Sequence, residues 1–189
     1  MLADLVRACR SIRRFRQDAA ISRQTLLDLI DVGRLSASGS NLQPLKYWIS
    51  VDPATNAKIF PHLSWAGYLT DWPGPEEGER PAAYIVVLGD KKIREDFGID
   101  PGIAAQTIML AACEKGIGGC MLTSVQRAPL RRALAIPEQY DILLVLALGL
   151  PVEKVVLEDV GPDGSIKYWR DADRVHHVPK RSLREIVIN

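Results

Sequence analysis

The sequence has little net charge, few cysteines and no long uninterrupted apolar segment. Its 24 basic and 23 acidic residues leave a formal charge of +1, so no overall field attracts the protein to nucleic acid or to a membrane surface. No segment reaches membrane-spanning length without a charge or a helix-breaking residue. The first residues also lack a secretory cleavage pattern. We therefore expect a cytoplasmic protein that binds neither nucleic acid nor membranes.

Metal-ligating residues are scarce as well. Cys9, Cys113 and Cys120 form an odd set, and the spacing of the last two matches no usual zinc motif. We interpret them as reduced and mostly buried thiols. His176 and His177 are adjacent, but no carboxylate or cysteine accompanies them at ligand spacing, so we expect no metal site.

What the sequence does contain is enough apolar material for one core. Its 189 residues, 47% of them hydrophobic, fit a single domain spanning 1–189. Continuous apolar runs at 82–89 and 142–149 are typical of strands buried on both faces. An apolar helix is predicted over 101–113, with Asp100 as its N-cap, and an all-round apolar helix lies in a domain centre or a subunit interface. We predict an α+β domain with helices around a mainly antiparallel sheet.

Shorter elements are predicted on either side of these runs. Leucine and valine at helical spacing over 2–9 indicate a first helix. Ser22 is a plausible N-cap for a second helix that ends near 33–36. The expected buried face of this second helix consists of Leu26, Leu27, Ile30 and Leu35. The alternating residues 185–188 predict a final strand.

A basic cluster follows the first helix. Arg10, Ser11, Arg13 and Arg14 lie within a few positions, next to the apolar Phe15. Arginine presents a planar fork of donors that fits phosphate oxygens two at a time, and serine adds a short-range donor. The cluster therefore favours an anion site. The alternative is a solvated basic face of an amphipathic helix.

A second polar segment, residues 36–44, separates the second helix from an aromatic strand at 46–51. It is small and polar throughout, and it includes Ser38, Gly39, Asn41 and Gln43. Such a loop lets backbone amides approach a ligand, while the side-chain amides can recognise donors and acceptors. An ordinary helix-to-strand turn has the same composition.

The two segments, in this order, resemble the nitroreductase family of flavin mononucleotide (FMN) enzymes. The matching residues are Arg10-Ser11-x-Arg13-x-Phe15 and Ser38-Gly39-x-Asn41-x-Gln43-Pro44. The resemblance implies that the first motif holds the flavin phosphate and the pyrimidine edge. It implies that the second motif borders the ring from the neighbouring subunit. Two positions depart from the family: Cys9 stands where arginine is frequent, and Ala37 where proline is frequent.

The resemblance extends to two later segments. A glycine-bearing turn and strand include Leu122, Thr123 and Ser124, which would offer backbone contacts near the reactive flavin nitrogen. A helix C-cap followed by a buried strand is the alternative interpretation. In the C-terminal segment, 165–189, Arg181 with Lys180 would return to the phosphate and help replace the arginine missing at position 9. This segment could also reach the partner subunit.

Residues 61–81 form a long irregular stretch. It carries Trp65, Tyr68 and Trp72 and an acidic run. Loops of this length usually bind or cover something. The aromatic side chains predict either a lid over a flat ring and its substrate or a loop fixed to the surface by its tryptophans.

The function implied by the resemblance rests on flavin chemistry. The resemblance implies a homodimer that binds FMN. Hydride would pass from NADH or NADPH, the co-substrate, through the flavin to a small oxidant such as a nitroaromatic or a quinone. No separate set of catalytic side chains is expected, and Arg13 would give electrostatic support. The alternatives are another flavoenzyme of the superfamily, such as a reductive dehalogenase or a dehydrogenase, and a non-enzymatic flavin-binding protein.

Overall fold

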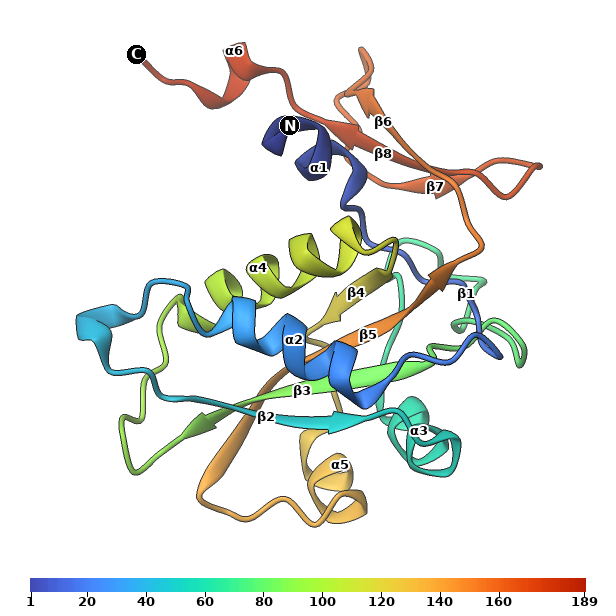
Figure 1. Ribbon diagram of the computed structural model, residues 1–189. Helices are drawn as coiled ribbons and strands as arrows, with labels where there is room; N and C mark the ends of the chain where they lie inside the picture. The colour runs from blue at the N-terminus through green and yellow to red at the C-terminus, as the bar shows by residue number, and fades with distance from the viewer.

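The computed structural model describes residues 1–189, and its centre is a five-stranded antiparallel sheet (Figure 1). The strands are β1 (Phe15–Arg16), β2 (Leu45–Ser50), β3 (Ala83–Asp90), β4 (Gly118–Leu122) and β5 (Tyr140–Pro151). The order is β1-β5-β3-β2, and β4 also pairs with β5. This arrangement confirms the predicted α+β class with a mainly antiparallel sheet.

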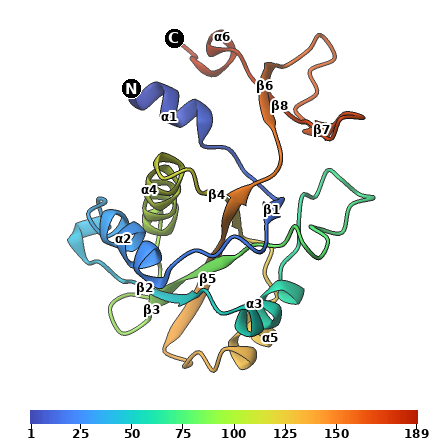
Figure 2. The same ribbon diagram turned by 45° about the vertical axis from the view of Figure 1, so that its right-hand side comes forward.

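Helices cover both faces of this sheet. The helices are α1 (Leu2–Ala8), α2 (Arg23–Gly33), α3 (Pro53–Ile59), α4 (Asp100–Glu114), α5 (Arg127–Ala133) and α6 (Leu183–Ile186). Short 3-10 turns lie at Gly39–Asn41 and Phe60–His62. Figures 1 and 2 show α2 and α4 on one face and α3 and α5 on the other. No helix in the chain is both long enough and apolar enough to cross a membrane.

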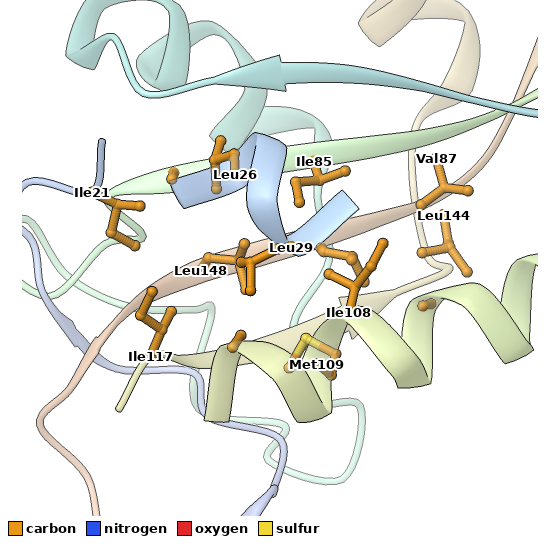
Figure 3. Close-up of a cluster of buried hydrophobic side chains, with 14 of the residues drawn as sticks. Ile21, Leu26, Leu29, Ile85, Val87, Ile108, Met109, Ile117, Leu144 and Leu148 are labelled. Atoms are coloured by element: carbon orange, nitrogen blue, oxygen red, sulfur yellow. The ribbon is translucent and has the colours of Figure 1, made fainter. Parts of the chain in front are cut away.

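The core is divided by the sheet into two apolar clusters. On one face, Leu29 of α2 and Ile108 of α4 pack over Ile85 and Leu148 of the central strands (Figure 3). Every residue of β3 is buried, because alternate side chains of this strand enter the two clusters. The continuous apolar runs in the sequence are therefore explained by a sheet covered on both sides.

A second, smaller sheet was not predicted. Its strands are β6 (Val155–Asp159), β7 (Trp169–Arg170) and β8 (His176–Lys180), in the order β6-β8-β7. β6 and β8 pair in parallel, and β7 pairs antiparallel with β8. The predicted strand over 185–188 is wrong, because α6 covers its first two residues and no strand follows. A capping box between Ser182 and Glu185 begins that single helical turn.

Two further expectations about helices need correction. Ser22 caps α2 as predicted, but the buried residues are Leu26, Leu29 and Gly33. Leu27 lies on the next position around the helix and Leu35 lies beyond its end, so they are 41% and 71% exposed. Asp100 is not the N-cap of α4, because Ile99 occupies that position. Asp100 lies in the first turn, and its carboxylate binds another segment.

Candidate functional site

The segment after α1 runs beside β4. Ser11 forms a parallel bridge with Gly119, and the Ile12 N–H donates to the Gly119 carbonyl at 2.8 Å. A cavity of about 210 Å³ lies between this segment and α4. Its lining residues are Cys9, Arg10, Ser11, Gln106, Met109, Gly119 and Met121. Arg10 and Ser11 of the first motif therefore line a hollow that is bordered by the backbone of β4.

Arg10 keeps donors available beside this cavity. Its Nη2 donates to the Val6 carbonyl at 2.7 Å, which fixes the side chain against the end of α1. Its Nε is buried and has no hydrogen-bond partner in the chain. No carboxylate lies within ion-pair distance of Arg10, so its charge remains available for an anion.

Gly119 is required where the strand meets the cavity. A Cβ at this position would lie 2.7 Å from Leu148 Cδ2 and 2.8 Å from both the Ala147 carbonyl oxygen and Met109 Cε. Any other residue would therefore displace packed atoms. Gly119, Gln106, Met109 and Met121 were not predicted as site residues, because nothing local in the sequence marks them as neighbours of Arg10 and Ser11.

Leu122, Thr123 and Ser124 lie farther along the same strand direction. β4 ends at Leu122, about 10 Å beyond Gly119 at the usual rise per strand residue. The Thr123 carbonyl accepts from the Val125 N–H at 3.0 Å, and the Ser124 carbonyl accepts from the Ser64 N–H at 3.0 Å. The first motif thus lies beside the start of β4, and Leu122, Thr123 and Ser124 lie at its end.

Arg13 is a buried cation of the first motif, with only 9% of its surface exposed. Its Nη1 lies 3.2 Å from His176 Nε2 and 3.4 Å from the Ser11 carbonyl oxygen. The guanidinium carbon lies 5.1 Å from the centre of the Tyr168 ring. No carboxylate forms an ion pair with the Arg13 side chain. A buried charge without a counter-ion is costly, so this guanidinium favours an electron-rich ligand.

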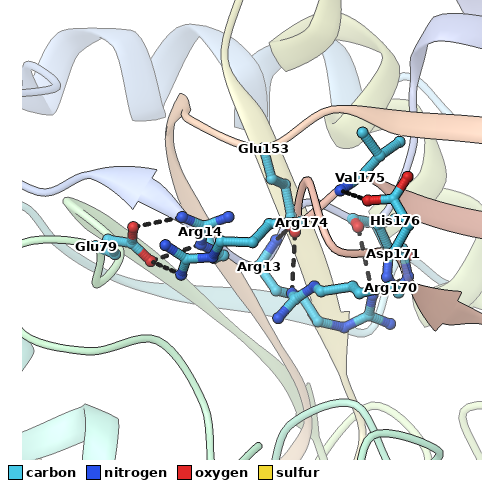
Figure 4. Close-up of polar contacts among 10 residues, drawn as sticks. Arg13, Arg14, Glu79, Glu153, Arg170, Asp171, Arg174, Val175 and His176 are labelled. Carbon is cyan, nitrogen blue, oxygen red and sulfur yellow. Dashed lines mark hydrogen bonds and ion pairs between the residues drawn. The ribbon is translucent and has the colours of Figure 1, made fainter.

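Glu153 organises the surroundings of Arg13 without neutralising its side chain (Figure 4). Its buried carboxylate accepts from the backbone N–H of Arg13 and from Arg170 Nη2, the latter at 3.0 Å. The Arg170 guanidinium lies over the Trp72 ring at 4.1 Å. Burial lowers the pKa of Arg170, while Glu153 opposes that shift. Neither Glu153 nor Arg170 was predicted, because their partners are remote in sequence.

Asp100 holds the second motif. Its carboxylate accepts from the Ser38 hydroxyl at 2.6 Å and from the Gly39 N–H at 3.0 Å. These hydrogen bonds, the one from Ser38 first, lower the pKa of Asp100. The loop is strained, because Ser40, Asn41 and Gln43 all have φ between 52° and 55°. Left-handed non-glycine residues cluster at functional segments.

The two motifs do not meet within one chain. Ser38 is attached to the first turn of α4, whereas Arg10 and Ser11 share a cavity with residues farther along that helix. No hydrogen bond or ion pair joins Asn41 or Gln43 to the first motif. Gln43 instead donates through Nε2 to the Asn41 carbonyl at 3.1 Å.

Lys180 is the last residue of β8, and Arg181 follows it directly. Figures 1 and 2 both show the segment after β8 passing close to α1. The Arg181 side chain is 53% exposed and lies 3.7 Å from Glu185 Oε1. No contact joins it to Arg10 or Ser11, so its predicted role at a phosphate stays a prediction.

The loop over 61–81 is irregular, as predicted, and it is fixed at several points. Trp65 is buried at 7% exposure. The Tyr68 ring lies 4.9 Å from the Tyr168 ring, and Trp72 lies under Arg170. These contacts favour the interpretation of a loop attached by its aromatic side chains. Closure over a substrate stays a prediction.

The paired histidines have different surroundings. His176 is 1% exposed and lies in the Arg13 cluster. His177 lies 3.0 Å from Glu158 and 3.1 Å from Asp171, and Asp171 in particular raises the pKa of His177. The chain holds no group of three or more His, Cys, Asp or Glu side chains arranged for a metal ion.

A larger hollow than the one beside β4 lies on another part of the chain. A cavity of about 600 Å³ separates α3 from the loop before β3, and Asn56, Phe60, Arg80 and Tyr84 are among its lining residues. It contains none of the predicted site residues. The smaller cavity beside β4 is the candidate site, because Arg10 and Ser11, two of the predicted anion-binding residues, line it.

Comparisons with known proteins place these features in a family. Residues 6–150 match the model described as the nitroreductase family. A Bacillus subtilis protein, YodC, a candidate NAD(P)H nitroreductase by its name, is 19% identical, with 88% of this chain and 97% of that protein covered.

Solved structures share the fold. A candidate nitroreductase from Desulfovibrio desulfuricans, solved in complex with FMN, has a TM-score of 0.72 and is 23% identical. The match covers 100% of this chain and 95% of the Desulfovibrio chain. An FMN-dependent nitroreductase from Clostridium difficile has a TM-score of 0.65 and is 20% identical, and the match covers 82% of this chain and 89% of the Clostridium chain.

Proposed function

The chain belongs to the nitroreductase family, and on that basis we propose that it is an FMN-dependent oxidoreductase. NADH or NADPH would be the electron donor, and a small oxidant such as a nitroaromatic or a quinone would be the acceptor. The FMN complex of the Desulfovibrio structure and the name of the Bacillus relative support this proposal.

The residues present fit an FMN molecule. Arg10 and Ser11 offer donors for the phosphate beside a cavity, and Arg10 Nε has no other partner. Arg13 offers a buried cation with a further unpartnered Nε. Gly119 of β4 lets Leu148 and Met109 pack directly against the strand beside the cavity. Arg181, with Lys180, would complete the phosphate site that lacks an arginine at position 9.

The protein contributes position and charge to the reaction. Bound FMN would supply two-electron transfer between the nicotinamide and the oxidant. Arg13 would stabilise the negative charge that accumulates at the pyrimidine edge on reduction, because its guanidinium is already desolvated and fixed. The backbone of residues 122–124 would border the ring. No acid–base pair of side chains is required.

We further propose a homodimer in which the second motif completes the partner's site. The separation of the two motifs within one chain supports this arrangement, since Asp100 holds Ser38 and Gly39 away from the first motif. Apolar side chains are exposed on the elements around α1 and α6. They include Leu2 at 71%, Leu183 at 74% and Ile186 at 60%, which is typical of a surface that a partner covers.

The observation that carries the proposal is the buried Arg13 guanidinium without a carboxylate partner, in a chain of this family. The test is to reduce the FMN-loaded protein with NADH or NADPH without oxygen, and then to add a nitroaromatic, a quinone or a halotyrosine. Rapid reoxidation by the first two supports the proposal. Reoxidation by the halotyrosine alone would indicate a reductive dehalogenase, and absence of reduction would indicate a non-enzymatic flavin protein.

A further inference from the structure

Arg13 and His176 meet in the interior, where the N-terminal segment crosses the start of β8. Arg13 Nη1 and His176 Nε2 are 3.2 Å apart, and the two residues are 9% and 1% exposed. Figure 4 shows both side chains in one cluster with Glu153 and Arg170. Both groups can carry a positive charge, so their contact in the interior depends on the protonation state of the imidazole.

The contact fixes the state of the histidine. A guanidinium has only donors and stays protonated in proteins, so His176 Nε2 must accept the hydrogen bond. The ring proton then lies on Nδ1, which is buried and has no partner in the chain. Burial, with Arg13 and Arg170 next, lowers the pKa of His176 to about 4. The ring is therefore a neutral acceptor at neutral pH.

The other charged groups near Arg13 and His176 have partners of their own. Glu153 accepts from the Arg13 backbone N–H and from Arg170. His177 faces Glu158 and Asp171. The Tyr168 ring contacts Arg13 by its face and lies 5.2 Å from the His176 ring. His176 is thus the imidazole acceptor of the Arg13 guanidinium, at 3.2 Å, and the buried Cys120 thiol is a further neighbour of that cation.

A neutral acceptor has an advantage that a carboxylate lacks. A glutamate at this position would orient the guanidinium equally well, but it would also cancel its charge. Imidazole nitrogen orients the group and leaves its full positive charge for a ligand. Arg14 illustrates the opposite case, because Glu79 binds it through both carboxylate oxygens and neutralises it.

We propose that His176 is a positioning residue that orients Arg13 toward the electron-rich edge of the cofactor while leaving the arginine charge uncompensated. This inference rests on the proposed function, since it assigns a role in flavin chemistry. In this role His176 would not contact the cofactor or the reacting atoms. It acts through the direction in which the Arg13 guanidinium points.

The first test needs no flavin. Long-range ¹H–¹⁵N correlation spectra of the free protein report the tautomer of each imidazole. We expect His176 to be neutral with its proton on Nδ1 at pH 7. We expect Arg13→Gln to raise the pKa of His176, because a neighbouring cation has been removed, and to leave His177 unchanged. A proton on Nε2, or a charged ring at pH 7, would overturn the proposal.

The second test uses the FMN-loaded protein. His176→Phe removes the acceptor and keeps an aromatic ring, whereas His176→Gln restores an acceptor near the position of Nε2. We expect the Phe variant to lower the flavin midpoint potential and to slow reduction by NADH at least tenfold. The ratio of FMN to riboflavin affinity should stay unchanged, because the phosphate contacts are untouched. The Gln variant should recover most of both losses.

A matched control separates positioning from folding. His177→Gln changes the adjacent histidine, whose ring faces Glu158 and Asp171, and should leave the midpoint potential unchanged. Equal potentials for the wild-type, Phe and Gln proteins would overturn the proposal and leave the proposed function intact. A wild-type protein that binds no flavin would overturn the proposed function and the cofactor role of His176 together. In that case the imidazole spectra still decide whether the Arg13–His176 pair exists.

Discussion

Arg14 and Glu79 form two parallel hydrogen bonds, each 2.6 Å long, between the N-terminal segment and the loop over 61–81. Arg14 is only 6% exposed, and Arg174 Nη2 approaches the same carboxylate at 3.4 Å. The bidentate geometry is the strongest form of an arginine–carboxylate pair. The loop is therefore attached by charge at one end and by tryptophan packing at the other.

The first prediction concerns this pair. Glu79→Gln should lower the free energy of unfolding by about 3 kcal/mol, because it leaves the buried Arg14 without a counter-ion. It should also increase proteolytic cleavage within 61–81. Chemical denaturation and limited proteolysis measure the two effects. Glu77→Gln, an exposed change in the same loop, is the control, and equal behaviour of the two variants would refute the attachment.

The pair also has a defined pH dependence. The hydrogen bond from Arg14 is the main cause of the lowered pKa of Glu79. Because the folded-state pKa lies below the unfolded one, the stabilisation is complete above the unfolded value. It is lost as the pH falls through the folded value. Wild-type stability should therefore decrease more steeply in acid than that of Glu79→Gln.

The second prediction concerns the strained loop of the second motif. Asp100→Asn removes the charge that accepts from the Ser38 hydroxyl and the Gly39 N–H, and it should cost about 1.5–3 kcal/mol, as for a hydrogen bond to a charged group. If the loop completes the partner's site, FMN affinity should fall as well. Asp31→Asn, an exposed residue paired with Arg34 on α2, is the control. Unchanged stability and affinity would contradict the assignment.

The third prediction concerns the phosphate. FMN should bind much more tightly than riboflavin, because loss of the phosphate leaves Arg10 and its neighbours without a partner. Arg10→Gln and Arg181→Gln should each reduce the affinity for FMN and leave the affinity for riboflavin nearly unchanged. Fluorescence titration of the free protein measures both ligands. Equal affinities of the wild-type protein for FMN and riboflavin would refute the phosphate site.

The fourth prediction concerns Arg13. Arg13→Gln keeps hydrogen bonding and removes the charge, so the flavin midpoint potential should fall by about 30 mV for each ~1.4 kcal/mol of lost stabilisation of the reduced form. Reduction by the nicotinamide should slow while FMN remains bound. If Arg13 is only a further phosphate ligand, FMN affinity falls instead and the potential of the loaded protein does not change. A potentiometric titration alongside the FMN dissociation constant distinguishes these roles.

Much of the fold could be predicted because its signals are local. The continuous apolar runs identified β3 and β5, and Ser22 identified the start of α2. The second sheet could not be predicted, since its short strands carry polar residues and pair across irregular connections. Residues 185–188 alternate like a strand, but the capping box that precedes them starts a helical turn.

The site was predictable only where the motif itself carries the chemistry. Arg10, Ser11 and Arg13 were identified from their spacing, but the partners of Arg13 were not. Glu153 lies 140 positions away from it, and His176 lies 163 positions away. A pairwise contact at such separation leaves no periodic signal in one sequence. Asp100 was assigned to the wrong role for the same reason, because its partners belong to a loop far upstream.

The central claim is that this chain binds FMN and passes electrons through it. The most direct measurement is the visible absorbance spectrum of the purified protein with equimolar FMN, recorded without oxygen before and after addition of NADH or NADPH. We expect a shifted flavin spectrum that bleaches within seconds of adding one of the two nucleotides and recovers when a quinone is added. A spectrum identical to that of free FMN, unchanged by either nucleotide, would contradict the account.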